Sequence, residues 1–183
     1  MTQHRYDPFT QSLHWMTALA VIAAYAIGIG REAIPKGDLR SLLLGLHMSI
    51  GILVLGLTMV RIGWRNFVPA PVPLPATKCT ALAAKLVHLG LYAAMLAIPV
   101  LGLLAAWAKG RDVGLFGLLA FPSPIGQDKV LAKSLEGAHE VAAHAMMLLV
   151  GLHAAAAIAH QTILKDGTLA RMLPGGRLTE TVR

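Results

Sequence analysis

Residues 138–161 read AHEVAAHAMMLLVGLHAAAAIAHQ, and this stretch decides the fold. Two of its histidines, His139 and His153, stand fourteen positions apart in one largely apolar run. In an α-helix, fourteen residues make nearly four turns, so both imidazoles lie on one face about 21 Å apart along the axis. If this helix crosses a hydrocarbon core about 30 Å thick, one imidazole lies near each side of the membrane. Because ionisable side chains inside a membrane are costly, the pair predicts two stacked metal centres.

The composition also indicates a membrane protein. Hydrophobic residues make up 56% of the 183 positions and charged residues only 14%, which is too apolar for an average soluble domain. The net charge of +7 does not indicate nucleic acid, because Lys and Arg fall at the ends of apolar segments, where they anchor a protein in lipid. With the single cysteine Cys79 and no CxxC pair, any metal must be held by histidine.

Four apolar stretches are long enough to cross a membrane, at about 12–30, 42–60, 82–107 and 138–164. Asp7 and Pro8 are typical of a helix start. No strand pattern and no internal repeat is seen. We therefore expect an all-α, integral membrane four-helix bundle that forms a single domain over residues 1–183.

The connecting segments differ in character. Residues 66–78 are rich in proline and cannot continue the second helix. Residues 108–137 form the longest loop, and we expect their apolar part, 113–122, to lie in the membrane interface. Nine Lys and Arg residues fall on the side of the termini and seven on the other. By the positive-inside rule, both termini are cytoplasmic and 165–183 is a cytoplasmic tail.

The depth of each histidine decides which of them can form a ligand pair. Depth pairs His47 with His139, and it pairs His153 with either His14 or His88. Two facing histidines offer a six-coordinate haem b suited to electron transfer. Of the remaining histidines, His160 lies on the same helix face as His153, near the cytoplasmic end. We exclude His144 because it is rotated by roughly 140° from His139 around the helix. We also exclude His4 because it precedes the membrane.

A structural role is the competing interpretation for any one of these histidines, since a lone histidine in a membrane helix often only bonds a neighbouring carbonyl. Five at matched depths make coincidence the weaker explanation. Several glycines near them leave space for a bulky macrocycle, although glycine also lets helices pack closely. These are Gly45, Gly51, Gly90, Gly102 and Gly151.

Several segments resemble the bacterial cytochrome b561 family over nearly the whole chain. They are TQSLHW (10–15), LHMSIGILVL (46–55), HLGLYAAMLAIPVLGL (88–103), the stretch 138–161 and LKDGTLARMLP (164–174). The resemblance implies an inner-membrane protein with two stacked haem b groups. Its fourth helix ligates both haems, and its first two helices give one ligand each. Carried over, this implies His14 with His153 for the cytoplasmic haem and His47 with His139 for the periplasmic one.

The resemblance also implies a quinone site at the edge of the cytoplasmic haem. A quinone carbonyl needs a hydrogen-bond donor that can pass on a proton. His160 is the first candidate, and His88 and Lys78 are the next.

One line of the family is described as a superoxide oxidase, which passes electrons from superoxide to ubiquinone. Seven outer basic residues would draw such an anion. They are Arg31, Lys36, Arg40, Lys109, Arg111, Lys129 and Lys133, and five nearby acids oppose them, namely Glu32, Asp38, Asp112, Asp128 and Glu136.

The leading interpretation is a stand-alone di-haem oxidoreductase that joins a periplasmic one-electron donor to the quinone pool. The second is a cytochrome b subunit that anchors a larger dehydrogenase or hydrogenase. The third is a haem-free, histidine-lined metal transporter, for which only Glu140 supplies an acid in the membrane. The small-residue faces of the helices also permit a homodimer.

Overall fold

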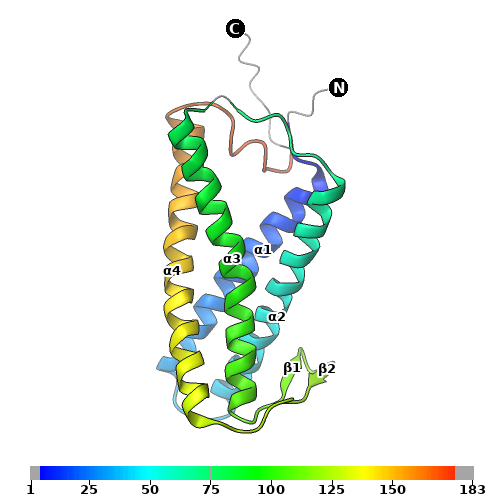
Figure 1. Ribbon diagram of the computed structural model, residues 1–183, viewed down its shortest axis with the longest axis vertical. Helices are drawn as coiled ribbons and strands as arrows, with labels where there is room; N and C mark the ends of the chain where they lie inside the picture. Colours follow the sequence, from blue (N-terminus) through cyan, green and yellow to red (C-terminus); the bar gives the residue numbers. More distant parts are fainter. Residues whose placement is uncertain (1–4, 75, 176–183) are drawn as a thin grey trace.

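A computed structural model of the chain describes residues 5–74 and 76–175. Four long helices form one bundle (Figure 1). They are α1 (Pro8–Gly30), α2 (Asp38–Phe67), α3 (Lys78–Ala108) and α4 (Lys129–Thr162), with a short 3₁₀ helix, η1 (Arg31–Ala33), between α1 and α2. Two three-residue strands, β1 (Val113–Leu115) and β2 (Leu119–Phe121), pair as an antiparallel hairpin between α3 and α4.

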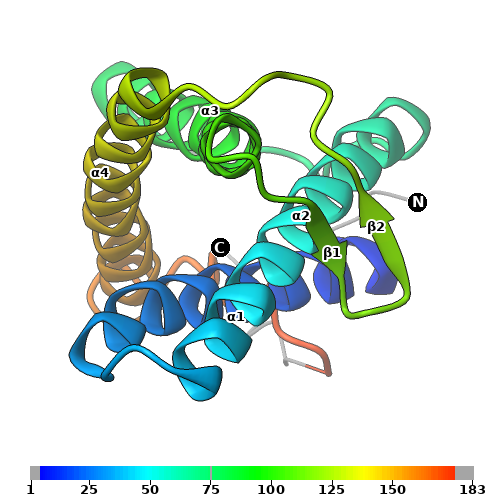
Figure 2. The same ribbon diagram turned by 90° about the horizontal axis from the view of Figure 1, so that it is seen from below.

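The bundle is built from two helical hairpins. Helix α1 packs along α2, α3 packs along α4, and α2 also packs on α3 (Figure 2). Buried apolar side chains from all four helices meet at mid-height. This core cluster consists of Ala20, Val21, Val54, Met95, Ile98 and Met146.

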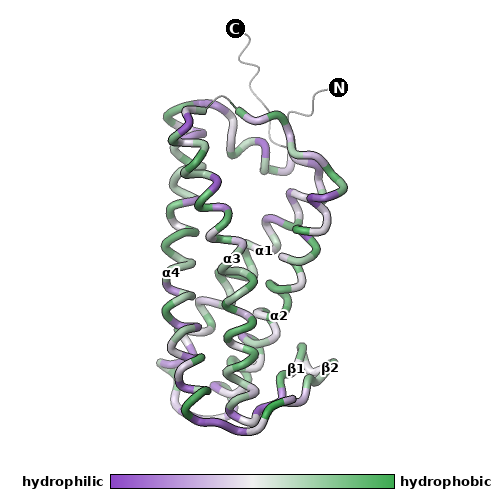
Figure 3. Tube along the Cα trace, viewed as in Figure 1, coloured by the Kyte–Doolittle hydropathy of each residue, from purple (hydrophilic) through white to green (hydrophobic). Residues whose placement is uncertain are grey.

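Apolar residues run along the length of the helices, as Figure 3 shows, and many of their side chains are exposed on the outside of the bundle. Leu19, Val141 and Leu148 are exposed to 67%, 70% and 77%. Each of the four helices is long and apolar enough to cross a membrane. Because such faces are stable only against lipid, the structure confirms the expected membrane bundle.

The helices begin and end where capping residues place them rather than where hydropathy falls. Asp7 accepts a hydrogen bond from the Thr10 amide at 3.0 Å and Pro8 occupies the first turn, as predicted. Helix α4 begins at Lys129, nine residues before the predicted start, because Asp128 caps it. Its first two turns carry the charges of Lys129, Lys133 and Glu136 and extend beyond the apolar span that the sequence shows.

The long loop differs from the expectation, because part of it forms the β hairpin. The Ser49 hydroxyl on α2 lies 3.1 Å from the Gly114 carbonyl oxygen and accepts a hydrogen bond from the Phe116 amide at 2.9 Å. Val113 is buried, whereas Phe116 and Leu118 are exposed. Strands of three residues are too short to leave an alternating pattern, so the strictly all-α expectation missed them. Contact of this loop with the membrane interface stays a prediction.

The segment after α4 folds back onto the start of α1 as far as residue 175. The Trp15 indole donates to the Met172 carbonyl at 2.8 Å, and the Gln11 amide donates to the Arg171 carbonyl at 3.0 Å. The first part of the expected tail is therefore docked, and residues 176–183 lie outside the described residues. We call this end of the bundle the terminal end and the opposite end, near β1 and β2, the hairpin end (Figure 1).

Candidate functional site

The histidines predicted as ligands lie in two layers, one toward each end of the bundle. The hairpin-end pair consists of His47 on α2 and His139 on α4, with ring centroids 5.9 Å apart. The terminal-end cluster consists of His14, His88 and His153. Within it the ring of His153 lies 6.2 Å from that of His14 and 5.3 Å from that of His88. The core cluster includes residues of every helix at positions between the two layers.

Backbone carbonyls orient both rings of the hairpin-end pair. Nδ1 of His47 lies 2.8 Å from the Ala24 carbonyl oxygen, and Nδ1 of His139 lies 2.9 Å from that of Ile98. A carbonyl only accepts, so each Nδ1 carries the proton and donates. Each Nε2 is then left with a lone pair that can bind a metal.

Two glycines make room for these rings. A Cβ atom on Gly28 would lie 3.0 Å from Cε1 of His47, and a Cβ atom on Gly102 would lie 3.0 Å from Cε1 of His139. Of the five glycines that the sequence indicated, only Gly102 touches a histidine. Gly90 instead faces Leu149, and the sequence gave no reason to select Gly28.

The two halves of the chain use the same spacings, which corrects the expectation that there is no internal repeat. In each half, a terminal-end histidine precedes the ring-orienting carbonyl by ten residues, and the glycine follows that carbonyl by four. The counterparts are His14 and His88, Val21 and Met95, Ala24 and Ile98, Gly28 and Gly102, His47 and His139, Val54 and Met146, and Arg61 and His153. Five of the six apolar members belong to the core cluster, and Ala24 does not. Within each hairpin, the first histidine of the second helix therefore meets a carbonyl and a glycine at corresponding positions of the first helix.

Arg61 lies beside the terminal-end cluster and was missed as a site residue, because the sequence suggested only a charge near a helix end. Its Nη1 is 3.3 Å from Nδ1 of His14, and its guanidinium carbon is 5.5 Å from the centre of the Tyr92 ring. This position, fourteen residues after His47, matches that of His153 after His139.

The histidine spacing fits axial ligation of haem iron. Metal–imidazole bonds are about 2 Å long, so two imidazoles on opposite sides of one iron have centroids roughly 6 Å apart. The hairpin-end pair has this spacing, and so have His14 and His153. The rings of His88 and His153 are closer. The residues present therefore fit a bis-histidine haem at each layer.

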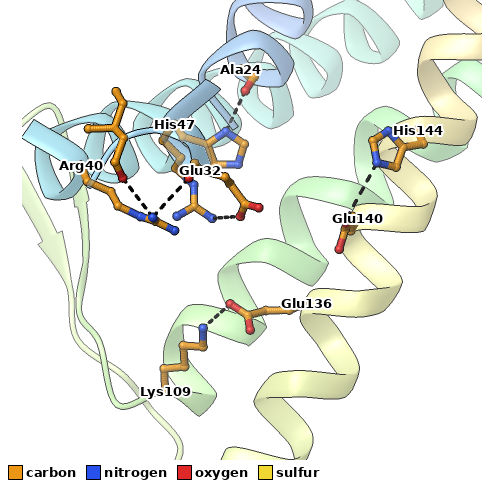
Figure 4. A network of polar contacts seen from close by, with 10 residues as sticks. Ala24, Glu32, Arg40, His47, Lys109, Glu136, Glu140 and His144 are labelled. Carbon is orange, nitrogen blue, oxygen red and sulfur yellow. Dashed lines mark hydrogen bonds and ion pairs between the residues drawn. The ribbon is translucent and has the colours of Figure 1, made fainter. Parts of the chain in front are cut away.

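A cavity of about 820 Å³ opens beside the hairpin-end pair. Five of the seven basic residues expected near the donor line it, namely Arg31, Lys36, Arg40, Lys109 and Arg111, whereas Lys129 and Lys133 do not. Lys109 forms an ion pair with Glu136, and Arg31 lies 3.4 Å from Glu32 (Figure 4).

Fewer of the nearby acidic residues lie beside these basic side chains in the cavity than the sequence suggested. Asp38, Asp112 and Asp128 are not among the lining residues. Asp128 caps α4, and Asp112 accepts from the Ser123 amide. Three carboxylates line the cavity, those of Glu32, Glu136 and Glu140, so its lining carries a net positive charge.

His144 lies apart from the hairpin-end pair, where the rotation on the helix predicted it. Its Nδ1 is 2.8 Å from the Tyr25 hydroxyl, and its Nε2 is 3.9 Å from Glu140 (Figure 4). Tyr25 had not been selected from the sequence. The other excluded histidine, His4, lies outside the described residues.

The candidate quinone residues all lie toward the terminal end. Lys78 is the first residue of α3, and His160 lies in the last turn of α4. His160 Nδ1 is 2.5 Å from the Asp166 carboxylate. Partial burial acts to raise the pKa of Asp166, but hydrogen bonds with His160 and Thr168 outweigh it and hold that pKa below its ordinary value. His88 is exposed beside His153.

The model of the prokaryotic cytochrome b561 family matches residues 5–175. The chain belongs to this family. It is 33% identical to cytochrome b561 homolog 2 of Escherichia coli strain K12, over 94% of this chain and 93% of that protein. It is 32% identical to the probable superoxide oxidase CybB of Yersinia pestis, and 34% identical to cytochrome b562 of Cereibacter sphaeroides, in each case over 94% of this chain and 98% of the relative.

Membership establishes a bacterial integral membrane cytochrome of electron transfer and implies haem b. The recognition made from the sequence segments is confirmed. The metal transporter is accordingly set aside.

Proposed function

We propose that this cytochrome holds two haem b groups in the bacterial inner membrane and passes electrons from superoxide, on the periplasmic side, to ubiquinone near the cytoplasm. The terminal end faces the cytoplasm in this proposal. The observation that carries it is the presence of two histidine layers that share α4, with facing rings 5.9 and 6.2 Å apart. The two haems supply one-electron redox chemistry.

The ligands in this proposal are His47 with His139 and His14 with His153. Carbonyls already fix the first pair in the tautomer that leaves Nε2 free. For the second pair, the 6.2 Å spacing of His14 from His153 is nearer to a shared iron than the 5.3 Å spacing of His88. His88 is then left to the quinone site.

The donor cavity favours a small anion. Among the described residues, Lys36, Arg40 and Arg111 line it without a carboxylate within ion-pair distance. Arg40 is instead held by the Ile34 carbonyl at 3.1 Å. Superoxide gives up one electron and leaves as O₂, so this cavity needs attraction but no proton acceptor.

The acceptor side has to deliver protons. Two superoxide anions yield two electrons, and ubiquinone takes these together with two protons to become ubiquinol. His160 is placed to donate one of them, because Asp166 fixes its ring through Nδ1. Lys78 and His88 are the further candidates at this end.

The alternative is a cytochrome b subunit that needs a partner enzyme. The purified chain alone distinguishes the two, because only the stand-alone protein couples superoxide to quinone without a partner. Formation of a homodimer stays a prediction.

The test follows haem reduction by enzymatically generated superoxide and haem reoxidation by a soluble ubiquinone. We expect superoxide dismutase to abolish the reduction. In His160→Ala, reduction should be unchanged and reoxidation about tenfold slower, with His144→Ala at the other end as a matched control. Failure of superoxide to reduce the haems would leave a cytochrome with a different donor. Unchanged reoxidation in His160→Ala would remove His160 from the acceptor site.

A further inference from the structure

We propose that Arg61 faces the terminal-end haem, binds a carboxylate of that haem and raises its midpoint potential. This inference rests on the proposed function, since it requires a haem between His14 and His153. It assigns a role to a charge inside the bundle that ligand spacing alone does not explain.

The first argument is position. Arg61 is the counterpart of His153 in the other half of the bundle. At the hairpin end, the counterparts His47 and His139 point at each other across one centre. The 3.3 Å contact of Arg61 with His14, whose ring faces that of His153, places its guanidinium beside the terminal-end centre.

The second argument is charge. The arginine guanidinium stays protonated, and a cation within a membrane bundle requires an anionic or carbonyl partner. Within residues 5–74 and 76–175, Arg61 forms no ion pair, and its buried Nε has no hydrogen-bond partner. Its neighbours are a histidine ring and the Tyr92 ring, neither of which carries a negative charge.

The third argument is proton placement on His14. When Nε2 of a neutral histidine binds iron, Nδ1 carries the proton and can only donate. The guanidinium can also only donate, so the contact between Arg61 and Nδ1 of His14 is lost when His14 becomes a ligand. Haem b brings its own anions, the two propionates, and a bidentate carboxylate is the partner that the planar guanidinium binds best.

A fixed cation beside the haem has a functional consequence. Reduction adds one negative charge to the haem, so a nearby positive charge favours the reduced form. The hairpin-end pair also has basic neighbours in the cavity lining, but two of them, Arg31 and Lys109, lie against the carboxylates of Glu32 and Glu136. Arg61 has no such carboxylate among the described residues, so its charge raises the potential of the terminal-end haem. The higher potential at the terminal end then directs electrons from the donor cavity toward the quinone.

The test is a redox titration of the two-haem protein in Arg61→Gln and Arg61→Lys, with the haem bands assigned by His139→Ala and His153→Ala. The matched control is Arg65→Gln, one turn further along α2, where Arg65 contacts the Val68 carbonyl and the Tyr6 ring. In Arg61→Gln we expect the equilibrium constant for reduction of the terminal-end haem to fall on the order of tenfold. The Lys variant should lose less, the hairpin-end haem should not change, and the propionate bands in resonance Raman spectra should shift.

Each outcome decides the matter. Two haems with an unshifted potential in Arg61→Gln would overturn the role of Arg61 and leave the proposed function intact. If Arg61→Gln loses the terminal-end haem, retention of that haem in Arg61→Lys supports the charge role, and loss in both variants overturns it. A wild-type protein without a haem at the terminal end would overturn both proposals.

Discussion

At the scale of single residues, the site depends on how each imidazole is held. The relative positions of His139 and His153 could be predicted from their spacing, because a fourteen-residue interval on one helix fixes both the face and the separation along the axis. Spacing could not predict that the carbonyls of Ala24 and Ile98 orient these rings or that Gly28 lies close to one of them. Each of these contacts joins residues on two different helices. Arg61 was missed for the same reason, because its role arises from what α1 and α3 place around it.

We predict that alanine at Gly102 or Gly28 weakens haem retention at the hairpin end. The new Cβ would sit 3.0 Å from the His139 or His47 ring and push it by a few tenths of an ångström. Such overpacking costs about 1–3 kcal/mol. Haem dissociation, followed by transfer to an acceptor protein, should accelerate at least several-fold.

Gly45→Ala is the matched control, because nothing lies within 4 Å of a Cβ built there. It should leave haem release unchanged and gain about 1 kcal/mol of helix propensity. Equal release rates in all three variants would show that ring placement does not depend on these glycines.

At the scale of elements, the segment after α4 acts as a cap on the terminal end rather than as a free tail. Asp166 accepts from His160 and from the amide and hydroxyl of Thr168, which links the last turn of α4 to this segment. The sequence of this segment, at 164–174, already resembled that of the cytochrome b561 family. Its docking could not be predicted, because the bonds that hold it use the carbonyls of Arg171 and Met172, which carry no sequence signal.

Asp166→Asn should make the stability of the folded protein less dependent on pH under acidic conditions. Hydrogen bonds hold the pKa of Asp166 below the value of about 3.9 expected in the unfolded chain. Its contribution to stability is therefore present above that pH and lost as the pH falls through the lower, folded pKa. Thermal unfolding in detergent should show the variant less stable by about 1 kcal/mol at neutral pH and with a shallower decline below pH of about 4. A parallel decline in both proteins would contradict this role.

At the scale of the whole molecule, the membrane bundle could be predicted because four long apolar runs leave no other architecture. The correspondence between the two hairpins could not be read from the sequence as one fixed period. The connection between α3 and α4 contains the β hairpin, whereas that between α1 and α2 is a short turn, so the repeat interval differs between the helices of each half. The two halves can be compared only through the equivalent contacts that His47 makes with Ala24 and that His139 makes with Ile98.

The charge around the donor cavity predicts a salt-dependent rate of haem reduction by superoxide. Attraction of a small anion is screened over about 8 Å at physiological ionic strength. The rate should fall as salt rises, and Arg111→Gln should lower the low-salt rate about two- to threefold without changing the spectrum. Lys133→Gln, outside the cavity lining, is the control. A rate independent of salt would contradict electrostatic attraction of superoxide by this cavity.

The central claim is that α4 supplies one ligand to each of two haems, and the haem content of histidine variants tests it most directly. Pyridine haemochrome assays should give two haems per chain for the wild type and one each for His139→Ala and His153→Ala, with different absorption bands lost. His14→Ala should resemble His153→Ala, whereas His88→Ala should keep both haems. One haem in the wild type, or two in either α4 variant, would contradict the account.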